Sequence, residues 1–169
     1  RLRSVRIEHD ILLQRVPSVP DLQSAWLILS MCASTRANFY LRTLQPSLTE
    51  EFAASHDRAI WQCLCKLLDR EIEPGDGNEN AQLIAQLPMR LGGLGLRSAT
   101  RHRHAAWWAS WTDVLGMIKQ RSAAVATELV AELGRGQAAR AQCIREAASS
   151  RELLLSEELE GCPNWEQAA

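Results

Sequence analysis

The sequence predicts an all-α fold, an irregular bundle of about six to eight helices with a glycine-rich hydrophobic turn near its middle. The 169-residue chain is 46% hydrophobic and 23% charged, as expected of a globular domain. Ala, Leu, Arg and Glu are common and a single Tyr is present, which favours helix over sheet. Apolar residues recur at helical spacing, and no stretch alternates convincingly with a period of two.

The first three expected helices cover the N-terminal quarter of the chain. Residues 1–16 have apolar positions along one side and end before Pro17. Residues 22–33 are apolar almost all round, so we expect a central buried helix there. Residues 35–44 continue as a short helix that stops before Pro46. The core-facing side of the first helix is expected to hold Val5, His9, Leu12, Leu13 and Val16.

A long helix is expected over residues 47–68, because Ser47 and Glu50 have the spacing of a capping box. Residues 69–80 are rich in Gly, Asp, Asn and Glu and predict a loop. Residues 81–87 add two helical turns. The inner face of the long helix is expected to hold Phe52, Ile60, Leu64 and either Leu67 or Leu68, with Trp61 beside them.

The second half of the chain also predicts helices. Ser98 is a suitable N-cap, and Trp107, Trp111 and Ile118 recur after it at helical spacing. Further helices are expected over residues 123–133, 137–148 and 151–159.

Positive charge is concentrated in one segment. The formal net charge is −1, so the overall charge implies no polyanionic partner. Residues 88–125, however, contain six Lys/Arg and one Asp/Glu, a local charge of +5, whereas residues 71–87 contain four acids and no base, a local charge of −4. The positive segment includes the glycine-rich stretch, so a site for a negatively charged ligand is most readily expected there.

The glycine-rich stretch LPMRLGGLGLRSA contains Gly92, Gly93 and Gly95. Leucines interrupt the run, and neither the Walker A spacing nor the dinucleotide-binding fingerprint is present. We therefore predict a tight turn anchored by leucines in a core, with glycines at positive φ angles. One alternative stays open: the backbone amides near Ser98, at the start of a helix, could contact a phosphate.

A basic cluster, Arg101, His102, Arg103 and His104, falls in the first turns of that helix, where positive charge opposes the helix dipole. Three explanations stay open: a bound polyanion, pairing with the acidic loop at residues 71–79, or a solvated surface.

Three tryptophans, Trp107, Trp108 and Trp111, follow the basic cluster. Tryptophans can stack on unpaired bases. Their helical spacing beside Val114 and Ile118 favours a place in the core, more strongly for Trp107 and Trp111 than for Trp108.

No catalytic constellation is visible. Gly-x-Ser-x-Gly, His-Glu-x-x-His and adjacent aspartates are all missing. The five cysteines are odd in number and irregularly spaced, so we expect reduced structural thiols. His9–Asp10 and His56–Asp57 could begin a metal site only with partners that spacing does not reveal. We predict no catalytic residue, no metal ligand and no cofactor.

The sequence has no signal peptide and no apolar run of about eighteen residues, so we expect a soluble intracellular protein, cytoplasmic or nuclear, with no membrane partner. Because the first residue is Arg1 and not Met, we expect a piece of a longer protein.

The order of several motifs suggests a family. LPMRLGGLGLRSA, followed by AAWWASW, resembles the segment downstream of the reverse transcriptase domain in non-LTR retrotransposon polyproteins. The stretches DLQSAWLILSMCASTRANFYLRTLQP and HDRAIWQCLCKLL are similar to the helical thumb and connection region. The resemblance covers about residues 5–130 and does not extend to residues 131–169.

The resemblance implies a thumb- or connection-like helical domain over residues 1–133 and a C-terminal helical extension over residues 134–169. Its partners would be an upstream polymerase palm and the backbone of RNA or an RNA–DNA hybrid. The family's Tyr/Phe-x-Asp-Asp box, zinc knuckle and endonuclease have no match here, so no catalytic residue is carried over. The parent protein would be an RNA-directed DNA polymerase, and enzyme activity of this chain stays open.

The leading hypothesis is a non-catalytic segment of a retroelement reverse transcriptase that supports the fold and contacts primer–template backbone. One alternative is a helical protein-interaction or scaffold module with no nucleic-acid role. A second is an enzyme whose site is assembled from distant residues, with His56 or Cys63 as candidates. The residues expected to contact phosphates are Arg90, Arg97, Arg101 and Arg103, with Arg36 and Arg42 behind them.

Overall fold

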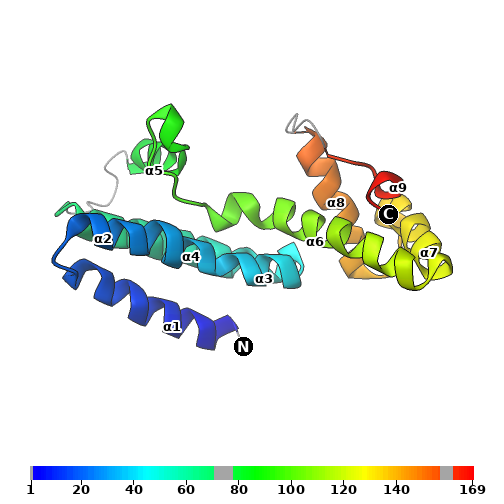
Figure 1. Ribbon diagram of the computed structural model, residues 1–169, viewed down its shortest axis with the longest axis horizontal. Coiled ribbons are helices and arrows are strands. Elements are labelled where there is room, and N and C mark those ends of the chain that lie inside the picture. Colours follow the sequence, from blue (N-terminus) through cyan, green and yellow to red (C-terminus); the bar gives the residue numbers. More distant parts are fainter. Residues whose placement is uncertain (1, 71–77, 157–161) are drawn as a thin grey trace. The chain divides into compact units, whose positions relative to one another are not determined.

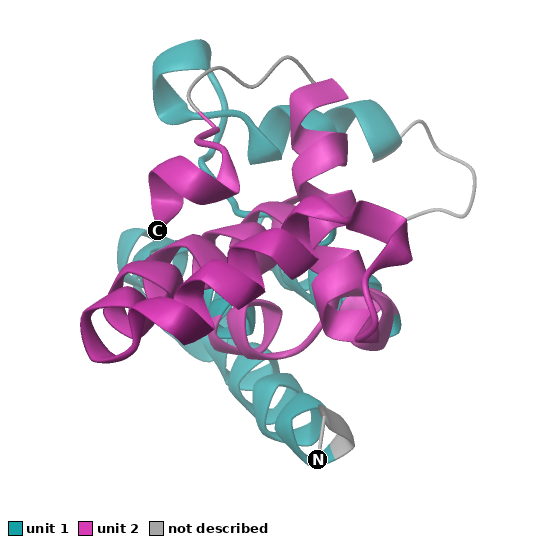
Figure 2. Cartoon of the chain, turned by 90° about the vertical axis from the view of Figure 1, so that its right-hand side faces the viewer, with its two compact units in different colours: residues 1–38, 51–100 teal, residues 39–50, 101–169 magenta. Residues whose placement is uncertain are grey.

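The computed structural model describes residues 2–70, 78–156 and 162–169. These residues form helices and no strand, which confirms the expected all-α class (Figure 1). The chain divides into two compact units: Arg1–Asn38 with Glu51–Thr100, here unit 1, and Phe39–Glu50 with Arg101–Ala169, here unit 2 (Figure 2). The domain boundary expected near residue 133 falls inside unit 2.

Unit 1 is built mainly from helices α1, α2, α4 and α5. His9 and Leu13 on α1 are buried, and so is Val16 directly after the helix, as the spacing predicted. Ala25, Leu29, Ile60, Leu64 and Leu96 join Leu13 and Val16 in one apolar cluster. The helices span α1 Leu2–Arg15, α2 Leu22–Leu27, α4 Pro46–Leu67 and α5 Asn78–Gln86.

The second expected helix is less buried than its composition suggested. A helical run extends from α2 through a π-helical segment, Ile28–Ala33, and a 3-10 segment, Ser34–Ala37, into α3, Asn38–Thr43. Only one side of it packs, and Leu22 and Met31 are 54% and 69% exposed. The expectation of a central buried helix was therefore wrong, because an apolar composition does not supply packing partners on every side. The buried stripe repeats every four residues: Ala25, Leu29, Ala33, Ala37 and Leu41.

Helix α4 begins one residue earlier than expected, at Pro46, a residue type that suits the first helical position. The expected capping box is wrong. The backbone amide and the hydroxyl of Ser47 instead donate hydrogen bonds to the Glu146 carboxylate, at 2.9 and 2.6 Å. Phe52, Ile60 and Leu64 are buried as expected, whereas Leu68 is exposed.

Unit 2 contains most of α6 together with α7, α8 and α9. Its core is a cluster of Trp107, Leu115, Leu133, Ile144, Ala147 and Trp165. A capping box between Asn164 and Gln167 caps the N-terminus of α9. The bounds are α6 Ala99–Arg121, α7 Ala123–Gly134, α8 Gln142–Ser156 and α9 Trp165–Ala168.

The break expected between residues 148 and 151 is absent, since α8 is continuous through both serines of that stretch. Ser150 is fully buried, and its hydroxyl lies 3.1 Å from Nδ1 of His104 on α6. A distant partner satisfies this hydroxyl, so it does not compete with the helix backbone. Residues 157–159 of the expected last helix, and most of the expected acidic loop at 69–80, lie outside the described residues.

Candidate nucleic-acid interface

The glycine-rich stretch forms the predicted turn. Gly92 and Gly95 adopt φ angles of 81° and 68°, in the left-handed region that favours glycine. Gly93 is required for a different reason: a Cβ atom there would lie 2.1 Å from the carbonyl oxygen of Leu87. The three glycines therefore fix a backbone path that other residues would strain or block.

Main-chain hydrogen bonds, more than leucine packing, hold this turn. The amides of Leu94 and Leu96 both donate to the carbonyl oxygen of Ala85, at 3.2 and 3.1 Å, and Gly95 N donates to Leu87 O at 2.8 Å. Leu96 is buried, but Leu91 is 62% exposed. The expectation that the leucines enter a core is correct for Leu96 and wrong for Leu91 and Leu94, both of which are exposed.

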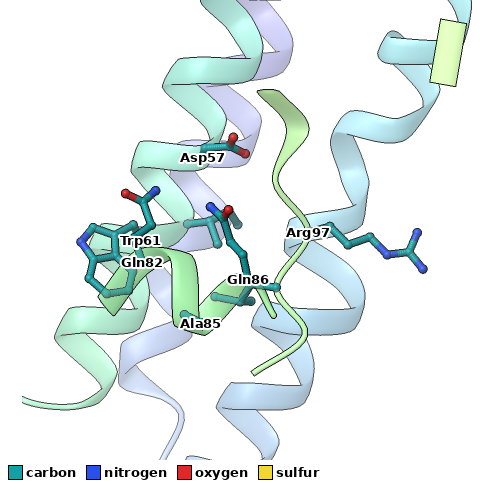
Figure 3. A pocket seen from close by; sticks show the side chains of 8 residues that line it. Asp57, Trp61, Gln82, Ala85, Gln86 and Arg97 are labelled. Atoms are coloured by element: carbon teal, nitrogen blue, oxygen red, sulfur yellow. The ribbon is translucent and has the colours of Figure 1, made fainter. Parts of the chain in front are cut away.

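Arg90 and Arg97, which flank the glycines in the sequence, are both exposed. Among the residues that the structure describes, neither forms an ion pair. Arg97 borders a cavity of about 10 Å³ lined by Asp57, Trp61 and Gln86, among others. That volume holds about one water molecule, too little for a ligand. The Arg97 guanidinium points away from the other labelled side chains (Figure 3).

The start of α6 is already occupied by a protein carboxylate. Asp57 on α4 accepts hydrogen bonds from the amides of Ala99 and Thr100, at 2.7 and 3.0 Å, and from the Ser98 hydroxyl at 2.8 Å. These are the amides that an anion at a helix N-terminus would use. The idea of a phosphate bound near Ser98 is therefore wrong, because Asp57 takes that place.

The basic cluster at the start of α6 is partly neutralised within unit 2. Nη1 of Arg103, whose side chain is 18% exposed, lies 3.0 Å from Oε1 of Glu50, as an ion pair and not as an aligned hydrogen bond. Its Nε donates to Nε2 of His104 at 3.2 Å. Arg101 and His102 are exposed. The acid that faces Arg103 thus comes from α4.

The two remaining candidate arginines differ in their surroundings. Arg42 pairs with Asp113 within unit 2. Arg36 is exposed in unit 1, and the part of the chain that the structure describes gives it no ion pair. Unit 1 thus holds Arg36, Arg90 and Arg97, and unit 2 holds Arg42, Arg101 and Arg103.

The tryptophans belong to the core of unit 2. Trp107 is buried, and Trp108 and Trp111 pack against the same apolar cluster. The rings of Trp107 and Trp111 meet edge to face, with 6.0 Å between centroids. This arrangement confirms the core prediction for Trp107 and Trp111 and leaves their faces unsuited to stacking on bases.

The structure brings together two histidines that spacing could not connect. His9 and His56 are buried in unit 1, with 5.4 Å between ring centroids. Burial, then the neighbouring His56 and Arg36, lower the pKa of His9 to about 4. Burial also lowers the pKa of His56. No group of three His, Cys, Asp or Glu side chains that could hold a metal ion exists among the described residues.

Cys63 is poorly suited to nucleophilic chemistry. Burial raises the pKa of its thiol to about 11, and Sγ lies 3.5 Å from the carbonyl oxygen of Leu13 as a donor. A thiol with this pKa stays protonated at neutral pH, whereas the thiolate is the reactive form. Of the two candidates for an assembled active site, Cys63 is therefore unsuited to act as a nucleophile, and His56 is buried with Nε2 3.3 Å from the carbonyl oxygen of Ser34.

Comparisons with known proteins assign no family. No protein-family model matches the chain, and neither a curated protein nor a solved structure is significantly similar to it. Within the described ranges, no helix has the length and apolar character needed to cross a bilayer.

Proposed function

We propose that this chain is a non-catalytic helical segment of a retroelement reverse transcriptase-like protein, which supports that protein's fold and contacts the backbone of primer–template nucleic acid. Its support is the order of motifs in the sequence, the all-α fold, and the way in which the glycine turn presents its arginines. An upstream polymerase palm would supply the chemistry.

The observation that carries the proposal is the exposure of Arg90 and Arg97 on either side of the glycine turn. The hydrogen bonds around Ala85 and Leu87 hold the turn's backbone in one conformation. Guanidinium groups displayed from a fixed backbone can contact phosphates, and such contacts position a nucleic acid without reading its sequence.

The proposal is tested by titrating an RNA–DNA hybrid against the chain at salt concentrations from about 50 to 300 mM. We expect the affinity to fall steeply as the salt concentration rises. In an Arg90→Gln/Arg97→Gln variant, the slope of log affinity against log salt concentration should be smaller, by the amount that corresponds to the loss of about one to two phosphate contacts. The matched control is Arg15→Gln/Arg121→Gln, which removes the same charge from two exposed helix C-termini. Absence of binding at the lowest salt, or an equal loss in both variants, would overturn the proposal.

A second function, a protein-interaction module, is favoured by a run of exposed apolar side chains. Within the short segment from α5 to the glycine turn, six large hydrophobic residues are more than a third exposed. Clustered exposed apolar surface often marks an interface. If this function holds, Leu83→Glu/Leu91→Glu should reduce self-association in sedimentation equilibrium without weakening hybrid binding. The six residues are Leu83, Ile84, Leu87, Met89, Leu91 and Leu94.

A further inference from the structure

A polar groove runs between α1 and α4 in unit 1. It has a volume of about 380 Å³, within the range of ligand sites. Leu13 and Cys63 line its floor and are buried. The walls come from residues spaced three or four apart, which places them on one face of each helix. The wall residues are Arg6, Asp10 and Gln14 on α1, and Ser55, Arg58, Gln62 and Lys66 on α4.

The groove is positively charged. Arg6, Arg58 and Lys66 contribute three positive charges, and Asp10 contributes one negative charge. Asp10 faces Arg6 at 4.0 Å, and both side chains are about half exposed. An ion pair of this kind is weak. Arg58 and Lys66 are exposed and have no ion pair to any residue that the structure describes.

The spacing of the cations sets the size of the ligand. Arg58 and Lys66 are eight residues apart on α4, roughly 12 Å along the helix axis. To share one phosphate group, both side chains would have to bend toward each other along the helix axis, whereas a ligand with several phosphates along its length can contact both in extended conformations. Gln14 and Gln62 add neutral amides that can bond to sugar hydroxyls or phosphate oxygens. The Ser55 hydroxyl donates to the carbonyl oxygen of Phe52 and can only accept a further hydrogen bond.

The groove lining also limits what the site can read. No aromatic side chain is among the residues that line the groove, so bases have no ring to stack on. Grooves that combine cations with aromatic platforms hold strands through their bases as well. A groove with cations and amides alone matches the sugar–phosphate backbone and gives no sequence preference.

We propose that the α1–α4 groove binds the sugar–phosphate backbone of one nucleic-acid strand, with Arg58 and Lys66 on two separate phosphates and Arg6 on the opposite wall. This inference rests on the proposed function, since it names a second place in unit 1 where the same ligand is held. None of these three cations lies in the +5 segment of the sequence.

The composition of the chain provides a direct test. Only two lysines are present, Lys66 in the groove and Lys119 in the last turn of α6, and both are exposed. Brief acetylation of the whole chain, read by mass spectrometry, measures the accessibility of both in one sample. With saturating single-stranded RNA we expect acetylation of Lys66 to fall at least threefold, while that of Lys119 stays the same.

A pair of variants separates the groove cations from other exposed arginines of the chain. Arg58→Gln/Lys66→Gln should weaken RNA binding about tenfold at low salt, and Arg15→Gln/Arg121→Gln should change it less than threefold. Circular dichroism and urea midpoints confirm that each variant is folded. Normal RNA binding by the groove variant, with Lys66 unprotected in the wild type, overturns this inference and leaves the proposed function standing. No RNA or hybrid binding by the wild type overturns both.

Inorganic pyrophosphate distinguishes a strand from a compact anion. Under the inference, millimolar pyrophosphate protects Lys66 weakly and RNA protects it strongly. Protection by pyrophosphate with none by RNA would identify a small-anion site and overturn the inference.

Discussion

Asp57 on α4 caps the first turn of α6: its Oδ1 accepts a hydrogen bond from the amide of Ala99 at 2.7 Å. The same carboxylate accepts from Thr100 N and the Ser98 hydroxyl. A negative charge at this end of a helix is also favoured by the helix dipole. One side chain thus satisfies the free amides, complements the dipole and excludes a phosphate from the same place.

Replacing Asp57 should destabilise the chain. We expect Asp57→Ala to lower the free energy of unfolding by about 1–2 kcal/mol, the range for a lost N-cap, and Asp57→Asn to lower it less, because one acceptor oxygen remains. Urea denaturation followed by circular dichroism measures both. Glu51→Ala, at an exposed acid on the same helix, is the control and should change stability by less than about 0.5 kcal/mol. Equal losses at Asp57 and Glu51 would contradict the capping role.

The glycines of the chain should differ in their tolerance of alanine. Gly93→Ala places a Cβ 2.1 Å from Leu87 O, and we expect it to destabilise the chain by about 3 kcal/mol, the upper range for overpacking. Gly134 is the last residue of α7, where a Cβ atom would meet no atom within 4 Å and the φ angle is not positive. Gly134→Ala should therefore be neutral or stabilising by a few tenths of a kcal/mol. A thermal melt of each variant decides the comparison.

The buried histidines predict loss of stability in acid. The pKa of His9 is about 4 in the folded chain against 6.5 for the free side chain, and the pKa of His56 is lowered as well. Below about pH 6.5 the unfolded chain binds protons that the folded chain does not, so stability falls as the pH drops toward 4. The fall of the His9 pKa from 6.5 to about 4 sets an upper limit of roughly 3–4 kcal/mol for the contribution of His9 to this loss of stability.

Stability should therefore be measured by urea denaturation from pH 7.5 to 4.5 in the wild type and in His9→Gln. Asp10 and Arg36 influence His9, and Asp57 influences His56, but these charged residues are the same in every chain compared. His102→Gln, at an exposed histidine, is the control for replacing a histidine. We expect a shallower pH dependence in His9→Gln alone. An identical slope in all three chains would show that the pair does not govern acid stability.

The core position of Trp107 predicts a large effect of truncation. We expect Trp107→Ala to destabilise the chain by about 3–5 kcal/mol. Its indole nitrogen is buried without a hydrogen-bond partner in the described part of the chain, so Trp107→Phe forfeits no hydrogen bond there and should lose less than half as much. Both are measured by urea denaturation. If Trp107→Ala instead left stability unchanged and weakened RNA binding, the ring would be a stacking platform.

The sequence could predict the elements of this fold because helical periodicity is local. The buried side of α1, the inner face of α4 through Ile60 and Leu64, and the positive φ angles of Gly92 and Gly95 all follow from residues a few positions apart. The apolar composition of residues 22–33 gave a wrong prediction of a helix buried on all sides. One side of this run, which includes Leu27 and Met31, has no packing partner among the described residues and is exposed.

By itself, the sequence determined that the chain is helical, where most helices lie, and that a glycine turn interrupts them. Only the tertiary structure decided which distant side chains meet: Asp57 with Ala99, His9 with His56, and Arg58 and Lys66 with the wall of α1. The physical reason is that side-chain spacing fixes which face of a helix is apolar. Which other helix covers that face, and which charges it brings, depends on packing between residues far apart in the chain.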